Sequence, residues 1–321
     1  MKQQSSRGIV GISLLFTALV MALALPLRIW QQIYLVESET GFWAVGGSRV
    51  SIALLYVAMG LLIAVPCFAS LTQRRRLSID LERRPRTGEG LAAFVAAAAI
   101  TIGAASALYF SLSVFSGRAV VYGVAPDPNA MMQFYIRSGA IAALLEAFFA
   151  ALSALFFVNL ALADLRPEKE IYLNRLLALM PVLWMVARVL RRFSRTIAYL
   201  RVSDLFITIA ALVLLLIFLL AFAQILSGIN SAGREWRLAA AGIPAAALLL
   251  LGFLPRVVAY RFVDGLVPSQ DAVRELADPA MALFIVVFIY GRIRQWAKAG
   301  AQQAEGKSQD SPEATTETET A

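Results

Sequence analysis

The chain has 321 residues, of which 60% are hydrophobic and 16% are charged, and its mean hydropathy is +0.71. Soluble domains carry roughly 45–50% apolar and about 25% charged residues, so this composition excludes an ordinary soluble protein and indicates a membrane protein. The formal net charge of +8 is spread over short loops between apolar runs. Because the chain lacks a long basic face interleaved with aromatic residues, we expect no binding of nucleic acid.

Two residue types limit the chemistry that the sequence allows. The chain has no histidine and one cysteine, Cys67. A histidine-activated nucleophile, a histidine metal ligand, a disulfide within the chain and a thiolate cluster are therefore excluded. We expect Cys67, which follows Pro66 in an apolar run, to be a small buried hydrophobic residue. Phosphate-binding loops and hydrolase motifs are also absent from the sequence, so we expect no enzyme, no cofactor and no metal site.

The chain begins with a basic segment and a long apolar run. Lys2 and Arg7 precede the run 9–27, which is long for a signal peptide and is followed by further apolar segments. Although Ala22 and Ala24 are similar to a cleavage site, we interpret the run as a retained signal anchor whose N-terminus is cytoplasmic.

The loop after this first apolar run carries Glu37 and Glu39, followed by Thr40-Gly41-Phe42-Trp43. It resembles the first outer loop of uncharacterised multi-pass bacterial membrane proteins, in which an acidic residue, Thr-Gly and an aromatic residue follow the first helix. The resemblance is confined to this short stretch, and it implies no activity.

The segment from Gln73 to Gly90 orients the whole chain. It contains six arginines and three acidic residues and lies between the apolar runs Ser51–Leu71 and Leu91–Phe115. A short loop this rich in arginine stays on the cytoplasmic side of a bilayer, because its translocation against the membrane potential is unfavourable. We therefore expect a protein of the cytoplasmic membrane of the cell, with both termini in the cytoplasm.

Small residues recur every fourth position in the third and fourth apolar segments. The third segment has Ala99, Gly103, Ala107 and Ser111, and the fourth has Gly139, Ala143, Ala147 and Ala151. Ridges of small side chains let helix backbones approach closely in lipid, so these two helices are expected to pack tightly against their neighbours.

The segment Ile171–Asp204 leaves the number of crossings open. Its apolar centre is short, and arginines 188, 191, 192 and 195 then form one stripe of about 100° on a helix. If the segment lies on the inner surface there are seven crossings, which charge counting slightly favours. From Ile171 to Arg195 a helix would measure about 37 Å, enough to cross ~30 Å of hydrocarbon, and its terminal arginines can reach the headgroups. We therefore expect eight crossings, with seven as the alternative.

The predicted fold is an all-α polytopic membrane helix bundle, with one domain over residues 1–300 and a disordered acidic cytoplasmic tail over 301–321. A short amphipathic outer helix is expected within 261–278. The predicted membrane helices are 9–30, 49–71, 91–115, 132–163, 172–192, 203–227, 238–260 and 279–297.

Glu146 is the strongest candidate for a functional residue. A carboxylate at membrane depth is unfavourable unless it is paired or neutral. Small residues at helical spacing surround Glu146, so we expect it to face other helices, with Arg188 or Arg137 as its partner. Asn159 and Gln224 complete a candidate intramembrane polar site with Glu146 and Arg188. A second candidate site, Arg191, Arg192 and Arg195, would contact lipid headgroups or a small anionic ligand.

Two functional hypotheses follow. In the first, the protein is transport-like or binds a small ligand, and a solvated cavity reaches Glu146. Helices broken at Pro181 and Gly242–Pro244 would fit this hypothesis, although ordinary kinks are the alternative. In the second, the protein is a non-transporting accessory or signalling protein, with dry packing around Glu146 and loops that meet a protein partner. The lipid bilayer, with anionic lipid among its components, is a partner in both.

Overall fold

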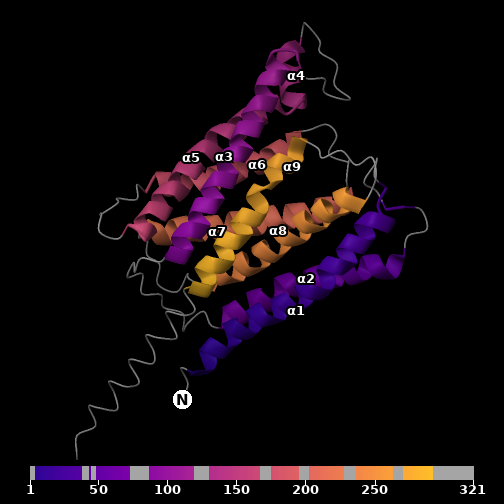
Figure 1. The fold of residues 1–321 in the computed structure, drawn as a ribbon, viewed down its shortest axis with the longest axis vertical. Helices are drawn as coiled ribbons and strands as arrows, with labels where there is room; N and C mark the ends of the chain where they lie inside the picture. The colour runs from indigo at the N-terminus through magenta and orange to yellow at the C-terminus, as the bar shows by residue number, and fades with distance from the viewer. Residues whose placement is uncertain are drawn as a thin grey trace, which may run out of the picture.

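The computed structural model describes residues 4–37, 43–44, 48–72, 87–118, 130–166, 175–194, 202–227, 236–262 and 270–291 (Figure 1). These residues are almost entirely helical, with one isolated bridge between Val36 and Trp43, which confirms the all-α class. The arginine-rich residues 73–86, Arg195 and the acidic tail lie outside the described residues.

The described helices follow one another along the chain with short connections. They are α1 (Gln4–Tyr34), α2 (Arg49–Thr72), α3 (Thr87–Phe115), α4 (Met131–Arg137), α5 (Ala140–Leu165), the 3₁₀ turn η2 (Leu177–Leu179), α6 (Met180–Ser194), α7 (Val202–Leu226), α8 (Trp236–Phe262) and α9 (Gln270–Glu275), and residues 277–291 form a last helix.

Six helices of the described part are long and apolar enough to cross a membrane. These candidate spans are Gly11–Tyr34, Arg49–Thr72, Thr87–Phe115, Ala140–Leu165, Asp204–Leu226 and Trp236–Phe262. The expected number of eight is therefore not confirmed, since α6 has only 15 residues and the described part of the last helix ends at residue 291.

The single helix expected over 132–163 is wrong, because the chain bends sharply within it. Gly139 has φ 74°, a left-handed conformation that only glycine adopts at little cost, and it separates α4 from α5. In the short α4, Phe134 is buried and Tyr135 packs edge-on against Phe115 of α3, with ring centroids 4.8 Å apart. Gly139 therefore forms a turn and is not part of a ridge of small residues on a helix.

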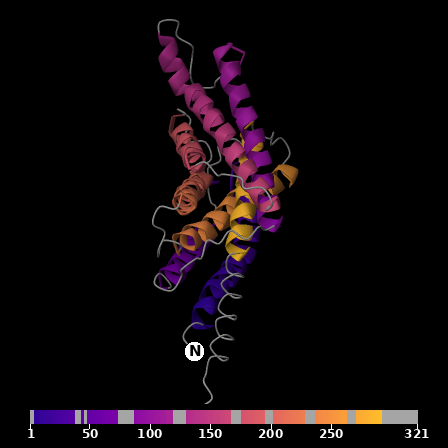
Figure 2. The same ribbon diagram turned by 90° about the vertical axis from the view of Figure 1, so that its left-hand side faces the viewer.

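Helices α3 and α5 lie side by side over most of their length, as two views show (Figures 1 and 2). At one end, Ser111 Oγ donates a hydrogen bond to the carbonyl of Ala140 at 2.9 Å. At the other end Gly90 faces α5 so closely that a Cβ there would lie 3.1 Å from the carbonyl oxygen of Ala161. Small residues thus bring the two backbones together, as expected for helices that associate in lipid.

Helix α8 occupies the centre of the bundle, and every residue from 238 to 249 is buried. It is continuous through Gly242–Pro244, so the hypothesis of a helix broken there is wrong. Pro244 has no N–H for the carbonyl of Ala240, and the thiol of Cys67 donates to that oxygen at 3.2 Å instead. Pro181 is the second residue of α6, a position where the missing N–H costs nothing.

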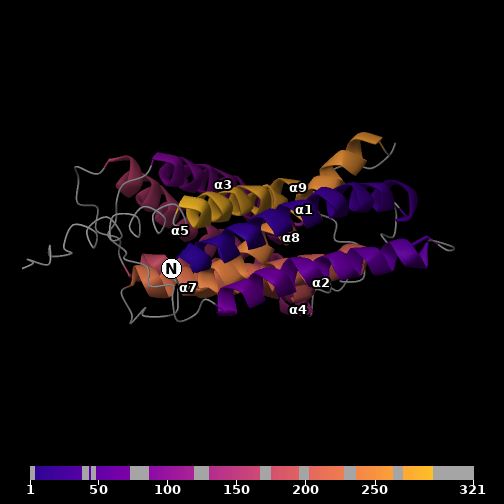
Figure 3. The same ribbon diagram turned by 90° about the horizontal axis from the view of Figure 1, so that it is seen from below.

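Aromatic packing joins α5, α7 and the last helix. Phe222 of α7 lies 6.2 Å from Phe156 and 5.1 Å from Phe288, measured between ring centroids. The planes are nearly perpendicular in both pairs, the edge-to-face geometry that aromatic rings favour. Seen from below, the long helices run in roughly the same direction across the view (Figure 3).

Candidate functional site

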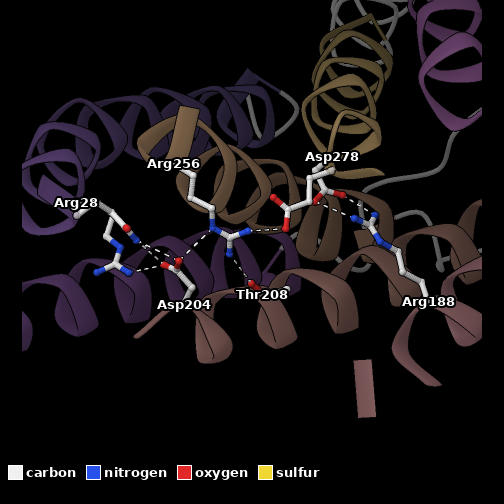
Figure 4. A network of polar contacts seen from close by, with 8 residues as sticks. Arg28, Arg188, Asp204, Thr208, Arg256 and Asp278 are labelled. Carbon is white, nitrogen blue, oxygen red and sulfur yellow. Dashed lines mark hydrogen bonds and ion pairs between the residues drawn. The ribbon is translucent and has the colours of Figure 1, made fainter. Parts of the chain in front are cut away.

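Asp204, in the first turn of α7, is the centre of a buried ion-pair network (Figure 4). Its carboxylate forms an ion pair with Arg28 of α1, and Arg256 Nε of α8 donates to its second oxygen at 3.1 Å. Gln32 Nε2 donates to both oxygens, at 2.9 and 3.1 Å. The side chain of Arg28 is fully buried and that of Asp204 is 4% exposed, so the charges compensate each other away from solvent.

Arg256 links Asp204 to the segment around α9. Its Nη1 lies 2.7 Å from Glu275 Oε1, and its Nη2 donates to the hydroxyl of Thr208 at 3.2 Å. One guanidinium therefore contacts two carboxylates and a hydroxyl, a use of several of its five donors that a lysine could not reproduce.

Two further arginines belong to α6. Arg188 contacts Asp278 with both terminal nitrogens, at 2.5 Å to Oδ1 and 3.0 Å to Oδ2. Arg191 forms an ion pair with Glu146 of α5, and both side chains are largely buried. The expected partners of Glu146, Arg188 or Arg137, are therefore wrong, since Arg191 takes that place while Arg188 binds Asp278. The two arginines are three positions apart, so they lie on one face of α6 but reach different helices.

All these charges lie at one end of the bundle. Helices α1, α6 and α8 contribute residues near their C-terminal ends, whereas α5, α7 and the helix 277–291 contribute residues near their N-terminal ends. Arg274 of α9 lies at the same end, with its guanidinium 4.9 Å above the ring of Phe110 and a hydrogen bond to the carbonyl of Ser106 on α3. From α5 to the last helix, consecutive helices thus alternate in direction at this polar end, whereas α1 and α8, which pack together, run the same way.

A pocket of about 60 Å³ opens within this network, between α6, α7, α8 and the junction that follows α9. That volume holds a few water molecules or one small ion. Thr208 and apolar residues of α7 and α8 complete its wall. Its charged lining is formed by Arg188, Arg191, Arg192, Arg256, Glu275 and Asp278. Four guanidinium groups therefore share the cavity wall with two carboxylates.

The structure brings some of the predicted site residues together and separates others. Arg188, Arg191 and Arg192 line the pocket, whereas Glu146 lies behind Arg191 and is not part of the lining. Asn159 and Gln224 are half-buried toward the opposite ends of α5 and α7, about 20 Å and 30 Å along the helix from Glu146 and Asp204 respectively. The expected grouping of Asn159 and Gln224 with Glu146 is therefore not what the fold produces.

Sequence reasoning missed most of the acidic residues and two of the arginines. Arg28 and Arg256 each lie within a predicted apolar helix, which is itself a signal for an intramembrane functional or pairing role. Asp204 lies at the boundary of the segment Ile171–Asp204, and Glu275 and Asp278 lie within the expected amphipathic segment 261–278, so none of the three carries a sequence signal of an intramembrane role. Their partners could not be identified, because Arg28 and Asp204 are 176 positions apart in the chain.

Comparison with protein-family models, with curated proteins and with solved structures found no match. In the described residues no cluster of three or more His, Cys, Asp or Glu side chains could hold a metal ion. The site must therefore be interpreted from its own geometry.

Proposed function

We propose that the protein is a multi-pass protein of the cytoplasmic membrane that binds a small anionic ligand in the arginine-lined pocket, in a transport-like or ligand-sensing role. The single observation that supports this most strongly is the composition of the pocket, where four arginines and two carboxylates line one cavity. Buried arginine is well suited to bind carboxylate and phosphate groups, because its planar fork matches their geometry.

The proposed topology has eight crossings, with both termini in the cytoplasm and the pocket facing the outer side. The contact between Arg28 and Asp204 supports it. If α1 ends outside, Arg28 lies near the outer side. The three crossings α2, α3 and α5 then leave the chain inside. Since α7 begins beside Arg28, α6 must cross back to the outer side. A segment 175–194 that stayed at the inner surface would start α7 on the wrong side. The burial of Trp184 and Met185 in the core also favours a crossing α6.

The arginines that would bind the proposed anion already have carboxylates beside them. Asp204 contacts Arg256 and Glu146 contacts Arg191 from outside the pocket lining. These acids lower the cost of burying the arginines. The surface that faces the cavity nevertheless carries more guanidinium than carboxylate groups. We therefore expect the pocket to favour anions over neutral molecules and cations.

A second candidate function is that of an accessory or signalling membrane protein that binds a protein partner. The observation in its favour is that Arg28, Arg188, Arg191 and Arg256 each have a carboxylate partner within the chain. In that case the network only holds seven elements together, and the pocket binds no anion.

The two candidates differ in a binding experiment on the purified full-length protein in detergent. Titration with acetate, inorganic phosphate and sulfate at constant ionic strength, followed by calorimetry and by thermal unfolding, measures affinity and stabilisation. Anion binding predicts a saturable rise in stability, about 2.7 kcal/mol at a concentration 100 times the Kd. If the ion pairs are only structural, the three anions should change the stability no more than any salt at the same ionic strength.

A matched pair of variants assigns any binding to the pocket. Arg192→Gln removes a lining charge and leaves the Arg188–Asp278 and Arg256–Asp204 ion pairs in place. Arg237→Gln removes an exposed charge near the other end of α8. We expect at least a fivefold weaker affinity for Arg192→Gln and no change for Arg237→Gln. Equal affinities in the two variants would contradict the proposed site.

A further inference from the structure

The carboxylates around the pocket belong to two groups. Asp204 and Glu146 contact Arg256 and Arg191 but do not line the cavity, whereas Glu275 and Asp278 contact Arg256 and Arg188 and do line it. The first pair supports the arginines from behind. The second pair lies on the side where a ligand would bind.

The contact between Arg188 and Asp278 has the geometry of ligand recognition. Two nitrogens of one guanidinium meet two oxygens of one carboxylate, at 2.5 and 3.0 Å. This is the parallel, bidentate arrangement by which arginine binds a carboxylate or phosphate ligand. The carboxylate of Asp278 therefore occupies the position that the oxygens of a bound oxyanion would take.

The two pocket-facing carboxylates are more exposed than the arginines that they contact. The side chain of Asp278 is 15% exposed against 8% for Arg188, and that of Glu275 is 18% exposed against 9% for Arg256. If Glu275 left its position, Arg256 would still contact Asp204. If Asp278 left, Arg188 would lose the carboxylate that it binds with two nitrogens, and an oxyanion in the pocket would restore that contact.

Glu275 and Asp278 lie on one short piece of chain. Glu275 is the last residue of α9, and Asp278 is the second residue of the helix 277–291, with a turn between them at Leu276. Movement of this junction would take both carboxylates out of the pocket together. A single local rearrangement could thus expose two arginines.

From these contacts we infer that Asp278, assisted by Glu275, is an internal competitor for the anion site, and that a small carboxylate or phosphate ion binds by replacing it on Arg188. The inference rests on the proposed function, and it adds the ligand class, the subsite and the residue that limits affinity. The pocket volume of about 60 Å³ restricts the bound group to a compact oxyanion.

The test compares the affinities of the full-length protein and its variants for acetate and for inorganic phosphate, measured by calorimetry at constant ionic strength. Asp278→Asn keeps the shape of the side chain and removes its charge, so we expect a Kd about tenfold lower than that of the unaltered protein. Asp278→Glu retains the charge and is expected to bind no tighter than the unaltered protein. The double variant Asp278→Asn/Arg188→Gln is expected to lose the increase in affinity that Asp278→Asn produces.

The outcomes separate this inference from the proposed function. If the unaltered protein binds an oxyanion and Asp278→Asn binds no tighter, the internal competitor is disproved and the anion site remains. If neither binds any oxyanion, both are disproved. If Asp278→Asn does not fold, Glu275→Gln replaces it in the comparison, and an affinity gain below about threefold in that variant overturns the inference.

Discussion

Asp204 shows how the network is balanced at the scale of single residues. Burying an ion pair gains little net stability, because the loss of hydration offsets the attraction between the charges. Removing one member is a different matter, since the partner is then left buried without compensation. Asp204 has two arginine partners, Arg28 and Arg256, so its loss would affect both.

For Asp204→Asn we therefore predict a loss of about 3–5 kcal/mol in the free energy of unfolding. The asparagine side chain keeps the size of aspartate but leaves two buried guanidinium groups with one negative charge fewer. Urea or thermal unfolding in detergent measures the loss. Glu37→Gln, which neutralises an exposed carboxylate just after α1, is the control and should change stability by less than about 0.5 kcal/mol. Equal effects of the two substitutions would show that the Asp204 network contributes no more than a surface charge.

The candidate site could be predicted only in part from the sequence. Glu146 is predictable because a carboxylate in an apolar helix is rare, and the arginines of α6 are predictable because they form a stripe on one face of a helix. Which arginine meets which carboxylate depends on helix rotation and on the bend at Gly139, and neither follows from periodicity. Arg188, the expected partner of Glu146, and Arg191, the observed one, are separated by less than one turn of α6.

At the scale of elements, the close approach of α3 and α5 depends on Gly90. A Cβ at this position would lie 2.9 Å from Leu165 Cγ and 3.1 Å from the backbone oxygen of Ala161, and a backbone atom cannot move aside as a side chain can. Gly60 on α2 offers the contrast, since a Cβ there would meet nothing within 4 Å.

Gly90→Ala should therefore lower the free energy of unfolding by about 1–3 kcal/mol through overpacking, although alanine is the better helix former. Gly60→Ala should leave stability unchanged or raise it by up to about 1 kcal/mol. Thermal unfolding of the two purified variants provides the comparison. A stabilising effect of Gly90→Ala would mean that the two helices are not in close contact at this position.

Element positions followed well from hydropathy where a segment was long and uninterrupted. The segments expected over 49–71 and 203–227 correspond to α2 and α7 to within one residue at each end. The segment 132–163 was divided because one glycine adopts a left-handed conformation, which small-residue spacing cannot reveal. Helix α6 begins later than expected, after the turn η2, because its apolar centre is short.

At the scale of the whole molecule, the charged ends of several helices share one side of the bundle. Arg28 lies near the end of α1, Asp204 at the beginning of α7 and Arg256 near the end of α8, and both arginines contact Asp204. With the eight crossings that we propose, these ends would lie together on the outer side. Seven crossings, with residues 175–194 on the inner surface, would place the end of α8 in the cytoplasm while α1 still ends outside.

Cysteine labelling in intact cells tests this arrangement most directly, in a Cys67→Ala background and with a membrane-impermeant maleimide. The probe positions are Glu37 after α1, Phe262 at the end of α8 and Arg166 after α5, which are all exposed. We predict that Glu37→Cys and Phe262→Cys react in intact cells, and that Arg166→Cys reacts only after permeabilisation. Labelling of Glu37→Cys without labelling of Phe262→Cys would put α1 and α8 ends on opposite sides, which the contacts of Asp204 with Arg28 and Arg256 do not allow.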